Sequence, residues 1–253
     1  MARWVIQLGR IDIIFALSCL NRFLAAPCQG YFDRLIKVWG YLKKFPSREF
    51  CVNTNKFLVD DEVKEVSNWT EQYPYAKEDI PPDRPNSYGP SIKITCFVDS
   101  DHAHEKKNRR SVTGFIICLN GMPLIWYCKR QGSVEASMYG AEFVALRTAV
   151  EHLKRLRISL MQLGVNIDGA CDVFGDNLSV ITHSEEPSST LKKKHLSIAF
   201  HLVRESVAAG IIDVYHCDSG ENPANPLTKA VPGPDLKVVE ETFIMIIAKS
   251  IED

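Results

Sequence analysis

The chain has 253 residues, of which 30 are basic and 31 acidic, and 45% of its residues are apolar. These values exclude an intrinsically disordered polyelectrolyte, a collagen-like repeat and a small disulfide scaffold, and they allow one large domain or two small ones. No run of 18 apolar residues is present, because Asp12, Asn21 and Arg22 interrupt the most apolar stretch, so the sequence predicts no membrane span. The eight scattered cysteines form no Cys-x-x-Cys pair, which favours a reducing, intracellular compartment.

Charge is distributed unevenly along the chain. Residues 1–48 carry eight basic and two acidic side chains, which suits a polyanionic partner, whereas residues 49–91 carry four basic and nine acidic ones. Five of the thirteen prolines lie between Pro74 and Pro90, where neither a helix nor a central strand can continue. We therefore expect an acidic, proline-rich linker over residues 66–91.

Hydrophobic periodicity predicts two helices before the linker and an alternation of strands and helices after it. Asp12 can cap the first helix, which runs from Ile13 to Leu24, and the second helix spans Phe32 to Lys44. Beyond the linker we expect strands at 92–98, 112–119, 124–128, 171–174 and 211–215, and helices from Ser137 to Leu156, at 191–209 and at 236–247. The pair Asn120-Gly121 tolerates positive φ and predicts a tight hairpin. This order predicts a mixed α/β sheet that opens with an antiparallel three-strand meander.

Three carboxylates occupy positions at which such a sheet gathers functional groups. Asp99 ends the first of these strands, Asp176 follows the fourth, and Glu142 lies in the first turns of the helix between them. Groups beyond the carboxyl ends of parallel strands converge on one crevice, and clustered carboxylates repel one another unless a hard cation such as Mg²⁺ lies among them. Two such ions, about 4 Å apart, activate water in phosphodiester cleavage. Acids at strand ends and helix starts are also common as caps, so the pattern alone leaves a structural role open.

Seven short blocks of residues follow one another in a fixed order. They are Phe97–Ala103 (FVDSDHA), Arg109–Phe115 (RRSVTGF), Cys128–Gln131 (CKRQ), Glu135–Phe143 (EASMYGAEF), Gly175–Ile181 (GDNLSVI), Lys192–Ile198 (KKKHLSI) and Asn222–Lys229 (NPANPLTK). Together they resemble the ribonuclease H domain of copia-type retrotransposon polyproteins. Three earlier blocks, Trp4–Asp12 (WVIQLGRID), Leu20–Pro27 (LNRFLAAP) and Gly40–Lys44 (GYLKK), resemble the C-terminal end of the reverse transcriptase that precedes that domain.

The resemblance, which covers roughly residues 3–231, implies a ribonuclease H-like α/β fold preceded by a small helical segment. The predicted organisation is a reverse-transcriptase remnant at 1–65, the linker at 66–91, a ribonuclease H-like domain at 92–231 and a C-terminal amphipathic helix at 232–253. No Tyr-x-Asp-Asp sequence is present, so polymerase activity of this chain alone is not expected.

The resemblance also assigns candidate site residues. Asp99, Glu142 and Asp176 match the family's catalytic, metal-binding acids, and Asp101 is an auxiliary acid. The family's fourth acid is replaced by Asn225, which offers a carbonyl oxygen but no charge, so we expect it to be a weak metal ligand and the second metal site to be impaired. Asp218 and Glu221 are candidates to compensate for the missing charge.

The activity implied is Mg²⁺-dependent hydrolysis of the RNA strand of RNA–DNA hybrids, with two ions if the site is intact and Mn²⁺ as a substitute. The expected partners are the hybrid, or another nucleic acid, and the upstream reverse transcriptase portion of the polyprotein, with no membrane partner. The expected location is the cytoplasm, in a virus-like particle, or the nucleus. The alternatives are a non-catalytic retroelement relic or nucleic-acid-binding module that keeps the fold, and a purely structural interaction protein.

Several basic residues are candidates for phosphate contacts. They are Lys106, Lys107, Arg109, Arg110, Lys192, Lys193 and Lys194. His195 matches the family's Lys-His block and is predicted to assist the substrate phosphate or a proton transfer, although a structural histidine is an equally good interpretation. A zinc site built from His102, His104 and His195 with Cys96 or Cys217 lacks any supporting ligand spacing.

Overall fold

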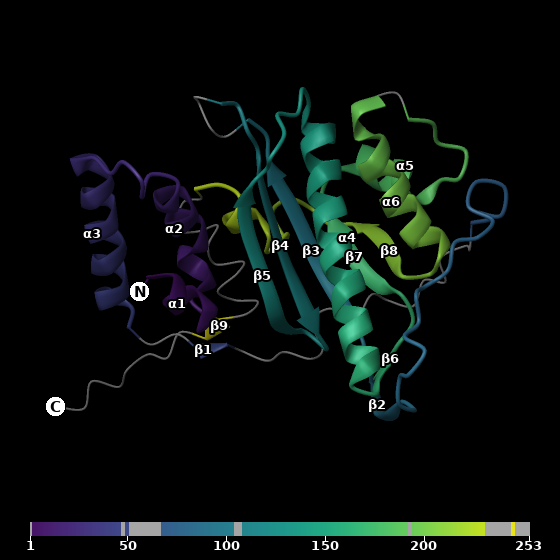
Figure 1. Cartoon of the computed structure of the whole chain (residues 1–253). Helices are drawn as coiled ribbons and strands as arrows, with labels where there is room; N and C mark the ends of the chain where they lie inside the picture. The colour runs from purple at the N-terminus through teal and green to yellow at the C-terminus, as the bar shows by residue number, and fades with distance from the viewer. Residues whose placement is uncertain are drawn as a thin grey trace.

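A five-stranded mixed sheet forms the centre of the computed structural model, which describes residues 2–46, 49–50, 67–103, 108–191, 194–230 and 244–245. The strand order is β5-β4-β3-β7-β8 (Figure 1). The strands are β3 (Ile94–Asp101), β4 (Val112–Leu119), β5 (Met122–Arg130), β7 (Cys171–Gly175) and β8 (Ile212–His216). The first three pair antiparallel as a meander, and β7 and β8 continue the sheet parallel to β3. The predicted ribonuclease H-like mixed sheet is confirmed.

The hairpin between β4 and β5 has the geometry that its sequence predicts. Asn120 and Gly121 have φ values of 46° and 79°, which only residues tolerant of the left-handed region adopt at low cost. The side-chain oxygen of Asn120 also accepts a hydrogen bond from the backbone N–H of Lys93 at 2.8 Å, which ties the turn to the start of β3.

One face of the sheet is covered by α4 (Met138–Gln162), α5 (Leu178–Glu185) and α6 (Ser197–Ala208). Ser137 caps α4 as predicted, accepting a hydrogen bond from the backbone N–H of Gly140 at 3.3 Å. The helix α5 was not predicted, and the helix expected at 191–209 begins only at Ser197, after the 3₁₀ turn η2 (Lys194–Leu196).

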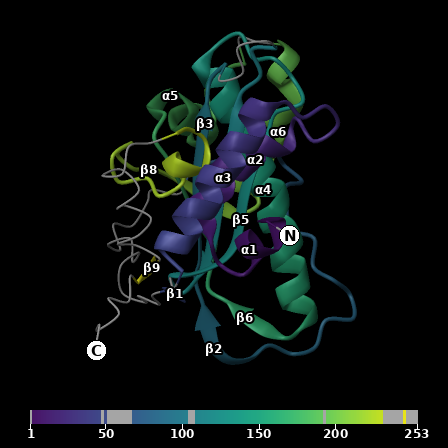
Figure 2. The ribbon, with the colours of Figure 1, turned by 90° about the vertical axis from the view of Figure 1, so that its left-hand side faces the viewer.

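The other face is covered by the N-terminal elements, as the view in Figure 2 shows. These are α1 (Ala2–Gln7), η1 (Ile11–Ile13) and α2 (Ile14–Asn21), and α3 (Gln29–Lys44) packs against α2 on the side away from the sheet. Ile11 and Leu17 are buried in one apolar cluster with Phe97 and Ile116 of the sheet. The predicted cap at Asp12 is wrong: its carboxylate receives hydrogen bonds from Arg10 and from the hydroxyl of Tyr41, so it joins η1 to α3 instead.

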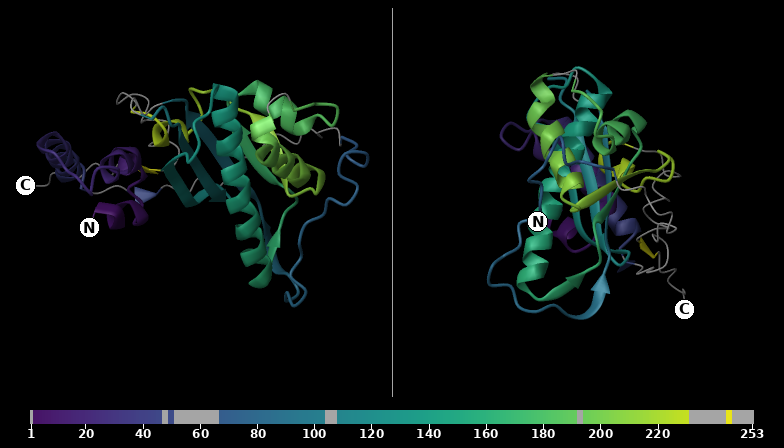
Figure 3. Two further views of the ribbon diagram at one scale, coloured as in Figure 1. Left: turned by 45° about the horizontal axis from the view of Figure 1, so that its top comes forward. Right: turned by 90° about the vertical axis from the view of Figure 1, so that its right-hand side faces the viewer.

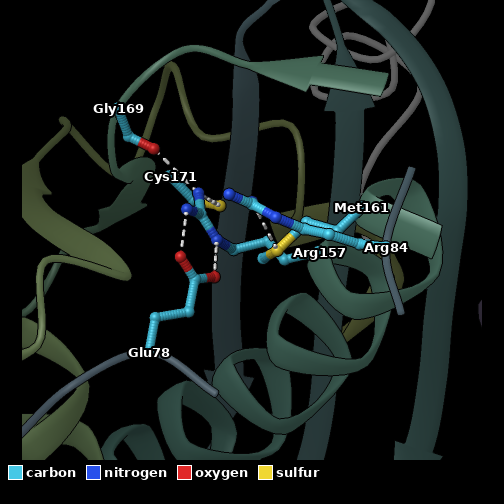
Figure 4. Close-up of polar contacts among 6 residues, drawn as sticks. All are labelled: Glu78, Arg84, Arg157, Met161, Gly169 and Cys171. Carbon is cyan, nitrogen blue, oxygen red and sulfur yellow. Dashed lines mark hydrogen bonds and ion pairs between the residues drawn. The ribbon is translucent and has the colours of Figure 1, made fainter. Parts of the chain in front are cut away.

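The described part of the predicted linker, residues 67–91, runs along the outside of the sheet domain and contacts it at separate places, and most of its residues are exposed (Figure 3). Trp69 is buried in the main core. Farther along, Glu78 accepts hydrogen bonds of 2.5 and 2.9 Å from Arg157 of α4 (Figure 4). The segment ends in β2 (Tyr88–Ile92), which pairs parallel with β6 (Val165–Ile167). Proline and charge patterns indicated a linker here, but the contacts are those of a packed strap.

Of the helix predicted at 236–247, only Ile244 and Met245 belong to the described residues. They form β9, antiparallel to β1 (Glu49–Phe50), so the helix prediction is wrong at these two positions, and its remainder lies outside the described residues. The domain boundaries at 65, 91 and 231 remain predictions. Within the described ranges, none of the helices has both the length and the apolar character required to cross a bilayer.

Candidate metal centre

Three carboxylates from separate elements meet at the carboxyl edge of the sheet. Parallel pairing places Phe97 of β3 opposite Phe174 of β7, and the same offset brings Asp99 level with Asp176, the residue after β7. Glu142 reaches the edge from the first turns of α4, which packs on β3. Each of the three offers one oxygen, and these oxygens all lie within 4.8 Å of one another. The structure thus brings together the three acids that the sequence predicts to converge.

Asp99 and Glu142 are held in position by hydrogen bonds from the protein. Asp99 is 1% exposed, and its Oδ2 accepts a hydrogen bond from the hydroxyl of Thr228. Glu142 is 8% exposed, and its Oε1 accepts one from the backbone N–H of Ser100 at 3.3 Å. Both carboxylates are therefore oriented before any ligand arrives.

The close approach of Thr228 requires a glycine on the neighbouring strand. Gly114 of β4 is the register partner of Asp99, and a Cβ atom added to it would lie 2.6 Å from Cγ2 of Thr228. Any larger residue would push Thr228 away from Asp99. Sequence reasoning did not identify Thr228, although it lies in the NPANPLTK block, because a threonine alone carries no signal of such a role.

Burial and mutual repulsion make the ionised forms of these acids unfavourable. Burial, together with the charges of Asp176 and Asp101, raises the pKa of Asp99 to about 7, although the hydrogen bond from Thr228 and the charge of Lys229 act to lower it. Burial, followed by the charges of Asp99 and Asp176, raises the pKa of Glu142 well above its ordinary value. A cation among these oxygens would remove both the repulsion and the desolvation cost.

The donor set fits a hard divalent cation. The ligands are oxygens only, and oxygen donors are the choice of Mg²⁺, Ca²⁺ and Mn²⁺, whereas zinc prefers nitrogen and sulfur. Among the residues that the structure describes, this is the single group of three or more potential metal-ligating acids, histidines or cysteines. The tentative zinc site does not form there: His102 and His195 both bind Glu135, Cys96 lies in the apolar core, and His104 lies outside the described residues.

Asn225, the residue at the position of the family's fourth acid, does not belong to the group of three. It lies in the 3₁₀ turn η3 (Asn225–Leu227), three residues before Thr228. Its Nδ2 donates to the backbone carbonyl and, at 3.1 Å, to the hydroxyl of Ser219. Its Oδ1 is buried and accepts no hydrogen bond from the described residues. Its role as a weak metal ligand stays a prediction.

The auxiliary acids and the two compensating candidates lie around the centre. Asp101 ends β3, and its charge acts on Asp99. Cys217 is half-buried, and burial raises the pKa of its thiol to about 12 together with the charges of Asp176, Asp99, Asp218 and Glu221. The charges of Asp218 and Glu221 therefore act on the same thiol as the charges of Asp99 and Asp176, and the side chains of Asp218 and Glu221 are exposed. Sequence reasoning missed that Cys217 borders the carboxylates, since a lone cysteine after a strand has no distinguishing pattern.

His195 lies in a separate pair of polar contacts and not among the three carboxylates. Its Nε2 lies 3.2 Å from Oε2 of Glu135, a carboxylate that is 5% exposed and also accepts from the hydroxyl of Ser133 at 2.8 Å. The ring of His102 contacts the backbone carbonyl of Glu135 at 3.0 Å. A buried carboxylate thus fixes one ring nitrogen of His195, while about half of that side chain remains exposed.

Part of the predicted phosphate-binding set can be placed. Arg109 and Lys194 are exposed, and Arg110 is half-buried with its Nε lacking an acceptor among the described residues. Arg109 has a positive φ of 53° in the turn before β4. Lys106, Lys107, Lys192 and Lys193 lie outside the described residues.

Comparison with known proteins identifies relatives among transposon polyproteins. The chain is 23% identical over 220 residues to the retrovirus-related Pol polyprotein from transposon RE1 of Arabidopsis thaliana, covering 87% of this chain and 13% of that protein. It is 30% identical over 145 residues to the corresponding polyprotein from transposon TNT 1-94 of Nicotiana tabacum, covering 57% and 11%. The chain spans only about an eighth of the length of these relatives. No protein-family model matches it.

Among solved structures, the chain is similar to LC11-RNase H1 in complex with an RNA/DNA hybrid. The identity is 18%, the match covers 54% of this chain and 94% of that one, and the TM-score is 0.43. The assignment of the fold rests on the strand order of the sheet and not on this match. The resemblance that the seven sequence blocks indicate is confirmed: the relatives of this chain include Pol polyproteins of copia-type retrotransposons.

Proposed function

We propose that this chain is a ribonuclease H-type endonuclease, corresponding to the end of the reverse transcriptase and the ribonuclease H domain of a Pol polyprotein. Its substrate is the RNA strand of an RNA–DNA hybrid, and its cofactor is Mg²⁺. The observation that carries the proposal is the convergence of Asp99, Glu142 and Asp176 at the edge of the five-stranded mixed sheet, with one oxygen of each within 4.8 Å of the others. The Pol homologues supply the biological context, and the upstream reverse transcriptase portion is the expected partner. Cytoplasmic or nuclear location stays a prediction.

The residues of the chain have distinct tasks in this proposal. Asp99, Glu142 and Asp176 hold the metal, which when bound supplies Lewis acidity and lowers the pKa of the attacking water. Thr228 keeps one oxygen of Asp99 oriented, and the backbone N–H of Ser100 does the same for Glu142. Asp101 adds negative charge that favours cation binding. The enzyme distinguishes the RNA strand from the DNA strand by the 2′-hydroxyl and by groove shape, because proteins make few contacts to base edges in such duplexes.

A hybrid-cleavage assay with matched variants tests the proposal. Replacing Asp99 and Asp176 together by Asn removes two of the three anionic ligands, so Mg²⁺-dependent cleavage should fall by roughly 100-fold or more, the equivalent of several kcal/mol of transition-state stabilisation. Asp168→Asn, an exposed position on the same domain, is the control and should cleave like the wild type. Cleavage that survives the double substitution overturns the proposal.

A second candidate is a non-catalytic relic or nucleic-acid-binding module that keeps the fold. The observation that favours it is Asn225, whose amide stands where the family has an acid and bonds to Ser219 instead. In that case the wild type binds hybrids without cleaving them at any Mg²⁺ concentration. Hybrid binding that is absent, or that does not depend on salt, favours the purely structural alternative.

A further inference from the structure

A groove of about 620 Å³ separates the N-terminal helices from the edge strand β5. Figures 1 and 2 show α2 lying alongside β5, at the opposite end of the sheet order from β8. The residues that line this α2–β5 groove include Ser18, Asn21, Arg22, Cys128, Lys129 and Arg130, and the others, apart from Gln7, are aliphatic or aromatic. The hydroxyl of Ser18 donates to the backbone carbonyl of Cys128 at 3.4 Å, which fixes α2 against the strand.

The α2–β5 groove is cationic. Arg22, Lys129 and Arg130 line it, and no carboxylate is among its lining residues. The Nε and Nη2 atoms of Arg22 are buried and donate to no acceptor among the described residues. Because buried donors without acceptors are destabilising, we expect this guanidinium to bind an anionic oxygen from another molecule. Phosphate is the anion that a guanidinium fork binds with two parallel hydrogen bonds.

The strand register places the groove level with the metal centre. Asp99 is paired with Gly114, and Gly114 with Cys128, so the three lie in one row across the meander. Asp101 and Arg130 end the row two residues farther along, through Val112, whose side chains point to the same face. Two strand spacings amount to roughly 10 Å, which is about three base-pair steps along a duplex.

The groove also opens on the sheet face that carries Asp99. Side chains alternate along a strand, so Asp99 points to the same face as Phe97, and Arg130 to the same face as Cys128. Lys129 points to the opposite face with Tyr127, and both line the groove where β5 forms the edge of the sheet. Phe97 and Cys128 belong to one apolar cluster with the N-terminal helices. A duplex lying across this edge of the sheet can therefore reach both the carboxylates and Arg22.

We propose that the α2–β5 groove binds the phosphate backbone of the duplex, so that the N-terminal segment and the sheet grip the substrate jointly. The proposal rests on the proposed function, because it places a second contact on the same duplex. The contacts are to phosphate, so they add affinity and register but no sequence preference.

Equilibrium binding of a fluorescent RNA–DNA hybrid to the full chain, in EDTA so that cleavage is prevented, tests the groove. Arg22→Gln and Lys129→Gln should each weaken binding by roughly 5- to 10-fold and reduce the slope of log affinity against log salt by about one. Arg34→Gln, which removes an exposed charge from α3 outside the groove, is the matched control and should change affinity less than about 2-fold. Arg22→Lys, which keeps the charge but loses the fork, should be intermediate.

The results of these measurements distinguish a failure of the groove proposal from a failure of the proposed function. Wild-type binding that is unchanged, with the same salt slope, in both Arg22→Gln and Lys129→Gln overturns the groove and leaves the proposed function intact. Absence of hybrid binding by the wild type overturns both. If inorganic phosphate raises the melting temperature of the wild type but not of Arg22→Gln, while hybrid affinity is equal in both, the groove is a small-anion site and the proposal fails. Lys129 is exposed, so its variant stays informative even if Arg22→Gln fails to fold.

Discussion

The fold buries the carboxyl groups of Asp99 and Glu142, and this burial makes their ionised forms less favourable. In the absence of a cation, the pKa of Asp99 in the folded protein is about 7 and that of Glu142 is raised well above its ordinary value, whereas both titrate near 4 when unfolded. Between these values the folded state binds more protons than the unfolded one. The free energy of unfolding therefore decreases as pH rises from about 4 to about 7, and the loss is complete above the folded pKa.

The decrease in the free energy of unfolding with rising pH leads to a prediction for metal binding. At pH 8 in EDTA the carboxylates are ionised and repel one another, so Mg²⁺ at about 100 times its Kd should add roughly 2.7 kcal/mol of stability. For a chain of this size that corresponds to a rise in melting temperature of roughly 5–10 °C. Thermal unfolding with and without Mg²⁺, at pH 8 and pH 5, measures it. The rise should shrink at pH 5, where protonation competes with the metal.

Asp99→Asn is the informative variant for this prediction, and Asp168→Asn is its control. The first should lose most of the Mg²⁺-dependent rise and should no longer lose stability between pH 4 and 7 to the same extent as the wild type. An equal Mg²⁺ effect in wild type and Asp99→Asn would show that the metal binds elsewhere.

Asn225→Asp should convert a weak site into a stronger one. The substitution adds a negative charge at the position whose Oδ1 is buried and has no hydrogen-bond partner in the described part of the chain, and it removes the hydrogen bonds from Nδ2 to Ser219. We expect roughly tenfold tighter Mg²⁺ binding, about 1.4 kcal/mol, and a comparable gain in hybrid cleavage, for a small loss of stability in EDTA. Isothermal titration and cleavage assays measure both, with Asn166→Asp, exposed on β6, as the control for added charge. Equal inactivity of wild type and Asn225→Asp favours the relic.

At the scale of elements, the strap 67–92 is attached to α4 by a largely buried ion pair. The side chains of Arg157 and Glu78 are 7% and 21% exposed, and Arg157 also donates to the backbone carbonyl of Gly169 at 2.8 Å (Figure 4). Glu78→Gln should lower the free energy of unfolding by roughly 3 kcal/mol, because it leaves a buried guanidinium without its counter-charge. Urea unfolding measures the change, with Glu71→Gln, at an exposed position of the same strap, as the control. Equal midpoints for Glu78→Gln and wild type would contradict a structural role of this pair.

Elements with long, regular patterns of apolar residues were predicted correctly from the sequence, whereas short elements and those that depend on distant contacts were not. β4 has the predicted bounds, and α4 begins after Ser137, because alternation and a capping serine are local signals. The helix α5 escaped prediction because it has only eight residues, and Leu178 at its start is exposed. Its cap, Asn177, which accepts from the backbone N–H of Val180 at 3.2 Å, was interpreted as part of a strand end. The three-residue β6 exists only through its pairing with β2, a contact that no local pattern records.

At the scale of the whole molecule, the segments that proline and charge patterns separate along the chain pack on one central sheet. The N-terminal helices bury Ile11 and Leu17 against its one face, and α4 and α6 form the main core with its other face. Trp69 from the strap joins that main core and stacks with Arg204, whose guanidinium carbon lies 4.8 Å from the indole centroid. The N-terminal segment, predicted to be a reverse-transcriptase remnant, and the strap therefore both pack on the central sheet domain.

The sequence alone determined the mixed sheet, the hairpin at Asn120-Gly121, the resemblance to copia-type polyproteins and the identity of the three acids. These follow from periodicity, turn chemistry and ordered residue blocks, all of which are written in neighbouring positions. Only the tertiary structure decided that Thr228 holds Asp99 through the space above Gly114, that His195 pairs with Glu135, and that Arg22 and Cys128 line one groove. Each of these contacts joins residues at least 60 positions apart, and a contact at that separation depends on how whole elements pack, which no local pattern specifies.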